Sequence, residues 1–274
     1  MADWRRIFLL ARFSLRRNRG ATLAFALSLG LFQATLIWGY GFIGGGATVR
    51  TVVDTLSPEL RRALKIVPSL QGGFGPREYV ALGLYHPVYL GLGAAYVVSR
   101  AADGLAGAVE RGTAWLILAR PVSRAALVAG EALAIALGAA LVVTSGLGGL
   151  LLGLATADLG PDLPLVGYAQ AAAASWLLFA ALGMLALLAA AASFRAGSAA
   201  GLGSALALGG FVLDLLPWTG GPPLSLVNPW HWYDPPAIIQ RGWSWPAAGM
   251  LGAIGLASLA GAVAVWRQAA IGGR

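Results

Sequence analysis

Charged side chains are scarce in this chain, and the stretch that the rest of the chain is arranged to hold covers residues 99–131. Only 11% of the 274 residues are charged, and there is no cysteine. The stretch lies between two long apolar runs and carries the arginines Arg100, Arg111, Arg120 and Arg124. Its helical pattern breaks at Pro121, because the residue before a proline avoids the helical conformation. We interpret the stretch as a contact surface on the cytoplasmic side of a membrane.

Known catalytic patterns are absent from the sequence. It has no H-E-x-x-H or G-x-S-x-G motif, and its two histidines, His86 and His231, fall on different sides of an expected span. We therefore expect no catalytic residues and no metal site. The ATP-binding pattern G-x-x-x-x-G-K-[ST] is also missing, since the sole lysine, Lys65, lies in an expected external loop. The chain is not expected to be an enzyme; if the protein uses ATP, another chain hydrolyses it.

The composition indicates which elements must position these residues. Hydrophobic residues make up 58% of the chain and the mean hydropathy is +0.74, whereas a soluble domain has about 25% charged residues. Long uncharged windows separate the charges, and each can hold a helix of roughly 20 residues, the length that crosses the hydrocarbon core. The expected fold class is all-α, a polytopic membrane protein with six transmembrane helices.

We expect one transmembrane domain, residues 1–274, which these windows divide into spans and connections. The expected spans cover residues 20–45, 78–99, 124–155, 165–194, 196–216 and 244–267. The expected connections are an external loop with a short helix at 46–77, a cytoplasmic coupling segment at 100–123, and an external loop or re-entrant segment, rich in proline and tryptophan, at 217–243.

Residues 1–19 are expected to form an amphipathic helix at the membrane interface. Trp4, Ile7, Phe8, Ala11 and Leu15 fall on one arc of this helix, beside a stripe of arginines. Apolar burial and attraction to anionic membrane lipids would hold the helix at the surface. The alternative is a basic orientation signal with no further role.

The positions of the basic residues predict the orientation in the membrane. With the N-terminus inside, six of the 19 Lys and Arg residues lie outside, namely Arg50, Arg61, Arg62, Lys65, Arg77 and Arg241, and the others lie on the cytoplasmic side. The net charge of +8 therefore reflects topology, and no nucleic acid partner is expected. An even number of spans places both termini in the cytoplasm and predicts a multi-pass protein of the cell membrane.

Three polar residues in or near the spans are candidates for a translocation path or its gate: Gln33, His86 and Asp214. Gln33 can instead link two helices by hydrogen bonds. His86 precedes Pro87, which bends the second span, so the histidine either senses protons or substrate or satisfies backbone groups freed by the bend. Asp214, at the outer end of the fifth span, is either functional or a solvated interfacial carboxylate.

The central segment is expected to hold an amphipathic helix from Ala101 to Leu118, followed by Ser123 as the cap of the third span. Such a helix, lying across the ends of two spans, is well shaped to be pushed by a soluble partner. An ordinary basic loop is the alternative.

Other local patterns predict packing. Gly149/Gly153 and Gly197/Gly201 are G-x-x-x-G pairs that allow helix backbones to approach, although chance pairs are expected among 39 glycines. Outside, Ser57 and Pro58 are suited to start a short amphipathic helix over L-S-P-E-L-R-R-A-L-K-I-V.

Residues 109–124, V-E-R-G-T-A-W-L-I-L-A-R-P-V-S-R, resemble the E-x-G-T-x-x-x-L-L-A-x-P-V-S-R signature of the type-2 ATP-binding-cassette (ABC) exporter permeases. The matching residues are Glu110, Gly112, Thr113, Leu116, Leu118, Ala119, Pro121, Val122, Ser123 and Arg124. The likeness extends to the basic N-terminal helix, the L-S-P-E-L-R-R-A-L segment, and V-N-P-W-H-W-Y-D-P-P, which is similar to the family's S-P-x-x-x-Y-D-P element. Glu131 stands where the family often has a lysine.

The resemblance implies an all-helical permease subunit that pairs with a second permease chain, as a homodimer or heterodimer, and with nucleotide-binding ATPase subunits. This chain would need no cofactor, and ATP and Mg would bind the ATPase. In such systems the segment between the second and third spans docks on the ATPase, and the N-terminal helix transmits its closure. Carried onto this chain, the partner-coupling residues are Glu110, Arg111, Gly112, Thr113, Arg120, Pro121, Ser123 and Arg124.

The expected function is therefore that of the membrane-spanning subunit of an ABC exporter, which moves a substrate with ATP hydrolysed by a separate subunit. The alternative is a stand-alone secondary transporter or channel, which needs ion-coupling groups near the bilayer midplane and usually an internal repeat. Spans rich in alanine, leucine and glycine suit an apolar or amphiphilic cargo, such as a lipid or drug, but helix packing needs the same residues.

Overall fold

The computed structural model describes residues 3–42, 45–58, 61, 65, 75–157, 159, 163–216 and 223–268. These residues form helices joined by turns, and no strand occurs among them. Within the described part of the chain, six helical stretches are long and apolar enough to cross a membrane. The expected fold class, an all-α polytopic membrane protein, is confirmed.

The candidate spans are α2 (Arg19–Phe42), the stretch Pro76–Glu110 that contains α5 (Pro76–Leu84) and α6 (Pro87–Ala101), α9 (Arg124–Thr156), α10 (Leu165–Ala191), α11 (Ala196–Leu215) and α14 (Trp245–Gln268). The other elements are α1 (Asp3–Arg17), α3 (Gly45–Thr55), the π-helix η2 (Ala102–Ala106), α7 (Gly107–Glu110), α8 (Thr113–Leu118), α12 (Pro223–Val227), the 3-10 helix η3 (Pro229–Trp232) and α13 (Pro235–Arg241).

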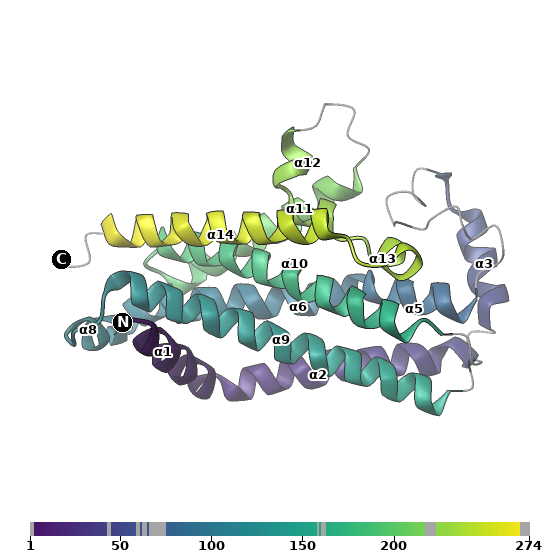
Figure 1. Cartoon of the computed structure of the whole chain (residues 1–274), viewed down its shortest axis with the longest axis horizontal. Coiled ribbons are helices and arrows are strands. Elements are labelled where there is room, and N and C mark those ends of the chain that lie inside the picture. Colours follow the sequence, from purple (N-terminus) through teal and green to yellow (C-terminus); the bar gives the residue numbers. More distant parts are fainter. Residues whose placement is uncertain are drawn as a thin grey trace.

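Helices α9 and α10 form the centre of the bundle. Helix α2 packs along α9 and α14 packs along α10, while α6 and α11 also contact α10 (Figure 1). In both α9 and α10, 67% of the most apolar stretch is buried, compared with 17% in α11 and 22% in α14. The peripheral helices α11 and α14 therefore present apolar surface that the described residues do not cover.

The two ends of the bundle carry different elements. The start of α1, the end of α14 and the short helix α8 lie together at one end, and α3 lies at the other (Figure 1). At the first end, Arg124 Nη1 donates a hydrogen bond of 3.2 Å to the carbonyl oxygen of Arg267. At the second end, Trp38 Nε1 donates a hydrogen bond of 2.8 Å to Thr156 Oγ1. We call them the α8 end and the α3 end.

Glycines bring the backbones of α2 and α9 into direct contact. A side chain at Gly149 would collide with the carbonyl oxygen of Gly30, and one at Gly153 would also collide with α2. The close packing predicted for the Gly149/Gly153 pair is confirmed. The Gly197/Gly201 pair faces open space in α11, so the corresponding prediction is wrong within this chain.

The second span is interrupted rather than bent. Helix α5 ends at Leu84, Tyr85 and His86 leave the helical path, and α6 begins at Pro87. His86 Nδ1 accepts a hydrogen bond of 3.2 Å from the backbone N–H of Val88. The histidine therefore caps the first turn of α6, in agreement with the interpretation that it satisfies backbone groups at the proline.

Helix α1 lies against α9 by a face that contains a serine. Ala11 and Ser14 are fully buried, and the backbone and Leu10 side chain of α1 lie against Gly130 of α9. Trp4 and Phe8 lie on the exposed side. One part of the predicted apolar arc, including Ala11, therefore contacts the protein, and another part, Trp4 and Phe8, forms an exposed aromatic surface.

Beyond the first span, helix α3 was not expected from the sequence. The amphipathic helix predicted after Ser57 falls mainly outside the described residues. Within the segment 217–243, the structure describes the short helices α12, η3 and α13. Helices α12 and α13 lie at the edge of the bundle (Figure 1), whereas η3 packs against α10, α11 and α14.

Candidate functional site

The coupling segment is built from three short pieces and not from one continuous helix. After α6, the helical path continues through the π-helix η2 and α7, which ends at Glu110 with Arg111 as its C-cap. Gly112 then takes a left-handed conformation with φ of +72°, which starts α8 in a new direction. Because residues other than glycine adopt this conformation at a cost, Gly112 is the structural reason why the predicted helix from Ala101 to Leu118 is wrong.

Helix α8 forms an exposed projection at the α8 end of the bundle (Figure 1). Within α8, Ala114 is buried, whereas Leu116 is 72% exposed and Trp115 is 43% exposed. Arg120 and Pro121, in the turn after α8, are also exposed. The projection therefore presents an apolar surface and a guanidinium group to the outside of the bundle.

Residues on either side of Gly112 join the segment to other helices. Glu110 Oε2 accepts a hydrogen bond of 2.9 Å from the backbone N–H of Ala196, the first residue of α11. A carboxylate at this place satisfies an unpaired N–H and lies at the positive end of the helix dipole. Thr113 Oγ1 donates a hydrogen bond of 3.1 Å to the carbonyl oxygen of Ala108, which closes the turn between α7 and α8.

The end of the motif positions α9. Ser123 Oγ accepts a hydrogen bond of 3.1 Å from the N–H of Ala126, so the predicted N-cap is present. Arg124 reaches the last turn of α14 through its hydrogen bond to Arg267. The motif residues thus contact α11, α9 and α14, although nothing in the sequence indicated which helices would lie within reach.

A buried charge cluster lies behind the coupling segment, where α1, α6 and α9 meet. Arg100 is 2% exposed, Glu131 is 7% exposed and Ser14 is fully buried. Ser14 Oγ donates a hydrogen bond of 2.7 Å to Glu131 Oε2 and accepts one of 2.8 Å from Arg100 Nη2. The Arg100 and Glu131 groups lie 3.8 Å apart. The serine hydroxyl therefore bridges a buried ion pair.

The cluster extends to the coupling segment through Asp103. Its carboxylate lies 3.6 Å from both Arg17 of α1 and Arg100. Arg111 Nη1 donates a hydrogen bond of 2.6 Å to Asp103 Oδ1, and Arg111 Nη2 donates one of 3.1 Å to the Asp103 carbonyl oxygen. A continuous series of charged contacts thus joins Arg111, at the turn before α8, to α1 and to Glu131 of α9.

Sequence reasoning selected Arg111 but missed most of this cluster. The missed members are Ser14, Arg17, Asp103 and Glu131. Arg100, which was expected on a contact surface, is buried. The available signal was Glu131, an acidic residue at the edge of a long apolar window. Buried charges are seldom found without a partner, so an acid and an arginine at the ends of two expected spans could have been paired.

Asp214 belongs to a second polar cluster. Its carboxylate oxygen Oδ2 lies 2.9 Å from Lys65 Nζ and 3.5 Å from the Tyr85 hydroxyl group. His231 Nδ1 lies 3.8 Å from Oδ1. Only 6% of the Asp214 side chain is exposed, so the interpretation as a solvated interfacial carboxylate is wrong.

The three residues predicted for the translocation path each lie at or beside the break in the second span. His86 caps α6, Asp214 bonds to Tyr85 in the break, and Gln33 of α2 lies beside Gly83, just before it. Gln33 is fully buried, and neither atom of its amide group has a hydrogen-bond partner in the described part of the chain. Within the described residues, the interhelical hydrogen bond considered for Gln33 is absent.

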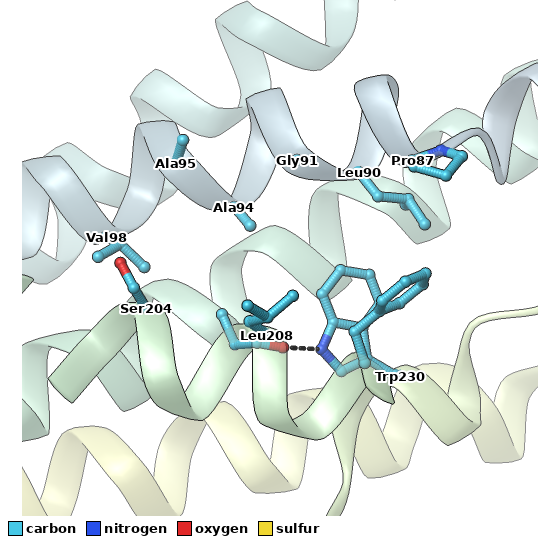
Figure 2. Close-up of a pocket in the computed structure, with 11 residues that line it drawn as sticks. Pro87, Leu90, Gly91, Ala94, Ala95, Val98, Ser204, Leu208 and Trp230 are labelled. Atoms are coloured by element: carbon cyan, nitrogen blue, oxygen red, sulfur yellow. Dashed lines mark hydrogen bonds between the residues drawn. The ribbon is translucent and has the colours of Figure 1, made fainter. Parts of the chain in front are cut away.

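A cavity of about 280 Å³ adjoins this break. Figure 2 shows it between α6 and α11, with Trp230 of η3 at one side. The indole Nε1 of Trp230 donates a hydrogen bond of 2.9 Å to the Ala207 carbonyl oxygen, drawn as the dashed line. The lining is almost wholly apolar: Pro87, Leu90, Gly91, Ala94, Ala95, Val98, Ser204, Ala207, Leu208, Phe211 and Trp230.

The fold and these polar clusters define a multi-pass helical membrane protein whose exposed projection is connected to its spans. A family model described as ABC-2 family transporter protein matches residues 67–251. The chain belongs to this family and is a permease of the ABC transporter type. A comparison with curated proteins finds no match. Among the described residues there is no group of three or more potential metal ligands.

Proposed function

We propose that this chain is the membrane-spanning subunit of an ATP-driven exporter. It moves a substrate across the membrane with ATP hydrolysed by a separate nucleotide-binding subunit, which binds ATP and Mg, and it works with a second permease chain. The observation that carries the proposal is the continuous charged series from Arg111 to Ser14 and Glu131. It links a projecting helix to the elements that must move during transport.

In this mechanism, the ATPase binds the α8 projection by its exposed apolar surface. Displacement of α8 acts on α7 at the Gly112 turn. Glu110 passes the movement to the start of α11 through the N–H of Ala196. Arg111 passes it through Asp103 to Arg17 of α1 and, by way of Arg100, to Glu131 of α9. Two adjacent residues thus drive two different groups of helices.

The same mechanism requires the α8 end to lie in the cytoplasm of the cell, where ATP is hydrolysed. The arginines of α1 and of the coupling segment support this orientation, because basic residues concentrate on the cytoplasmic side. Both termini then lie in the cytoplasm, and the exposed side of α1 contacts membrane lipids of the inner leaflet.

For the substrate path, we propose the space between α6 and α11. The cavity there is apolar and adjoins the break in the second span at Pro87. Gln33, His86 and Asp214 lie at the break itself and are not among the residues that line the cavity. An apolar or amphiphilic substrate suits this lining, since a cavity of this kind offers few hydrogen-bond partners.

Substitution of Leu116 by aspartate tests ATPase docking. Leu116 is 72% exposed, so Leu116→Asp leaves the fold intact and places a charge in the proposed interface. We expect loss of copurification with the ATPase and loss of ATP-dependent transport in proteoliposomes. Phe194→Asp is the matched control, because Phe194 is 44% exposed in another turn, before α11. Equal copurification of both variants with the ATPase would contradict the docking role of α8.

A stand-alone secondary transporter or channel, the alternative function, predicts a different result. The purified chain would then move solute down an ion gradient without an ATPase. We expect no such transport, and its observation would exclude the proposed subunit role.

A further inference from the structure

The ammonium group of Lys65 occupies a complete binding site. Nζ lies 2.9 Å from Asp214 Oδ2, donates a hydrogen bond of 2.7 Å to the carbonyl oxygen of Tyr233 and donates another of 3.0 Å to that of Trp230. It also lies 5.0 Å from the ring centre of Tyr85, within the range of cation–π attraction. Three oxygen acceptors thus match the three N–H donors of a primary ammonium group.

The groups that bind this ammonium are held in place by contacts that do not involve Lys65. The Trp230 indole is bonded to the backbone of α11 at Ala207. The Tyr233 hydroxyl group donates to the carbonyl oxygen of Leu84 at 2.9 Å. The carboxylate of Asp214 lies 3.5 Å from the Tyr85 hydroxyl group and 3.8 Å from His231 Nδ1. The site is therefore a preformed part of α11, η3 and the break between α5 and α6.

A cavity of about 650 Å³ adjoins the same carboxylate. Asp214, His231, Ser225 and Asn228 line it together with apolar side chains, including Leu185, Leu206, Leu213, Leu216 and Leu224. Its volume is within the range of about 300–1,000 Å³ that is typical of ligand sites. One acidic group beside a large apolar lining is the arrangement that suits a cationic amphiphile.

We infer that Asp214, the carbonyl oxygens of Trp230 and Tyr233, and the Tyr85 ring form a binding site for the primary ammonium group of an amphiphile, whose alkyl chain lies in the adjoining cavity. Lys65 occupies the ammonium site in this conformation and competes with the ligand. A trimethylammonium group has no N–H donors and leaves the two carbonyl oxygens unpaired, so it binds weakly. The inference concerns binding alone and does not depend on ATP-driven transport.

The test uses the full chain in lipid nanodiscs and follows thermal unfolding. The substitution Lys65→Ala removes three carbon atoms and the ammonium group of the side chain. The removed part corresponds to n-propylammonium. We expect n-propylammonium and n-octylammonium to raise the Tm of Lys65→Ala, with the octyl compound acting at lower concentration because its chain enters the cavity. In the wild type, the half-saturating concentration of n-octylammonium should be at least about tenfold higher, since Lys65 competes through charge-assisted hydrogen bonds.

Two controls separate this site from general binding of a detergent-like cation. In the double variant Lys65→Ala/Asp214→Asn, the response to n-octylammonium should weaken by about tenfold or more, and n-octyltrimethylammonium should not exceed that weak response in either variant. Equal responses of the single and double variants to n-octylammonium would overturn the inference. Equal responses of Lys65→Ala to n-octylammonium and to n-octyltrimethylammonium would also overturn it. If Lys65→Ala does not fold, Lys65→Met retains an apolar stem over Tyr85 and is tested in the same way, with the same outcomes.

Discussion

The hydroxyl group of Tyr233 donates a hydrogen bond of 2.9 Å to the carbonyl oxygen of Leu84, a residue 149 positions earlier in the chain. Leu84 is the last residue of α5, so its carbonyl group has lost its helical partner at the break in the second span. Tyr233 comes from the W-Y-D-P-P segment after η3 and also lies 2.8 Å from Ser175 Oγ of α10. One buried phenol group therefore holds three separate parts of the chain together.

Substitution of Tyr233 by phenylalanine should destabilise the protein by about 1–3 kcal/mol, because a buried carbonyl oxygen loses its donor. Thermal unfolding of the purified chain measures the effect. Tyr168→Phe is the matched control, since Tyr168 is equally buried and its hydroxyl group has no hydrogen-bond partner within the described residues. A loss of stability no larger than that of Tyr168→Phe would show that the Leu84 hydrogen bond contributes little.

Glu131→Ala should cost about 3–5 kcal/mol, since it leaves the buried Arg100 guanidinium without its carboxylate. The double variant Arg100→Met/Glu131→Leu should recover most of this stability, because apolar residues can replace a buried ion pair. If the cluster transmits movement, the double variant will nevertheless lose stimulation of the partner ATPase by substrate. Unfolding curves give the first quantity, and ATP hydrolysis by the assembled complex gives the second. Full stimulation in a stable double variant would remove the cluster from the coupling mechanism.

At Gly112 we expect alanine and asparagine to behave differently. The left-handed conformation costs an ordinary residue about 1–2 kcal/mol, whereas asparagine tolerates it better. Gly112→Ala should therefore favour a straighter path from α7 into α8 and reduce transport, and Gly112→Asn should retain most of it. The measurement is ATP-dependent transport in proteoliposomes at equal protein content. Identical activities of the two variants would show that the direction of α8 does not depend on this conformation.

Gly149→Ala should destabilise the bundle by about 1–3 kcal/mol, because the added methyl group forces the backbones of α2 and α9 apart at Gly30. Gly201→Ala is the control, since Gly201 faces open space within this chain. Thermal unfolding of the isolated chain compares them. A smaller effect at Gly149 than at Gly201 would contradict the close approach of the two helices.

The sequence by itself determined the fold class and the approximate positions of the spans, because the transfer of an apolar segment into lipid depends on that segment alone. It also determined the local features of single segments, such as the Ser123 cap and the disturbance of the second span at Pro87. These effects act over a few neighbouring residues, and so a linear pattern records them.

Only the tertiary structure decided which polar groups meet. Asp214 looks like a solvent-exposed carboxylate in the sequence, but packing of α11 against η3 buries it and brings Lys65 to it. Glu131 looks like a single deviation in a motif, but packing of α1 and α6 on α9 supplies Ser14 and Arg100 as partners. The physical reason is that burial changes the cost of a charge, and burial depends on which helices are neighbours in space.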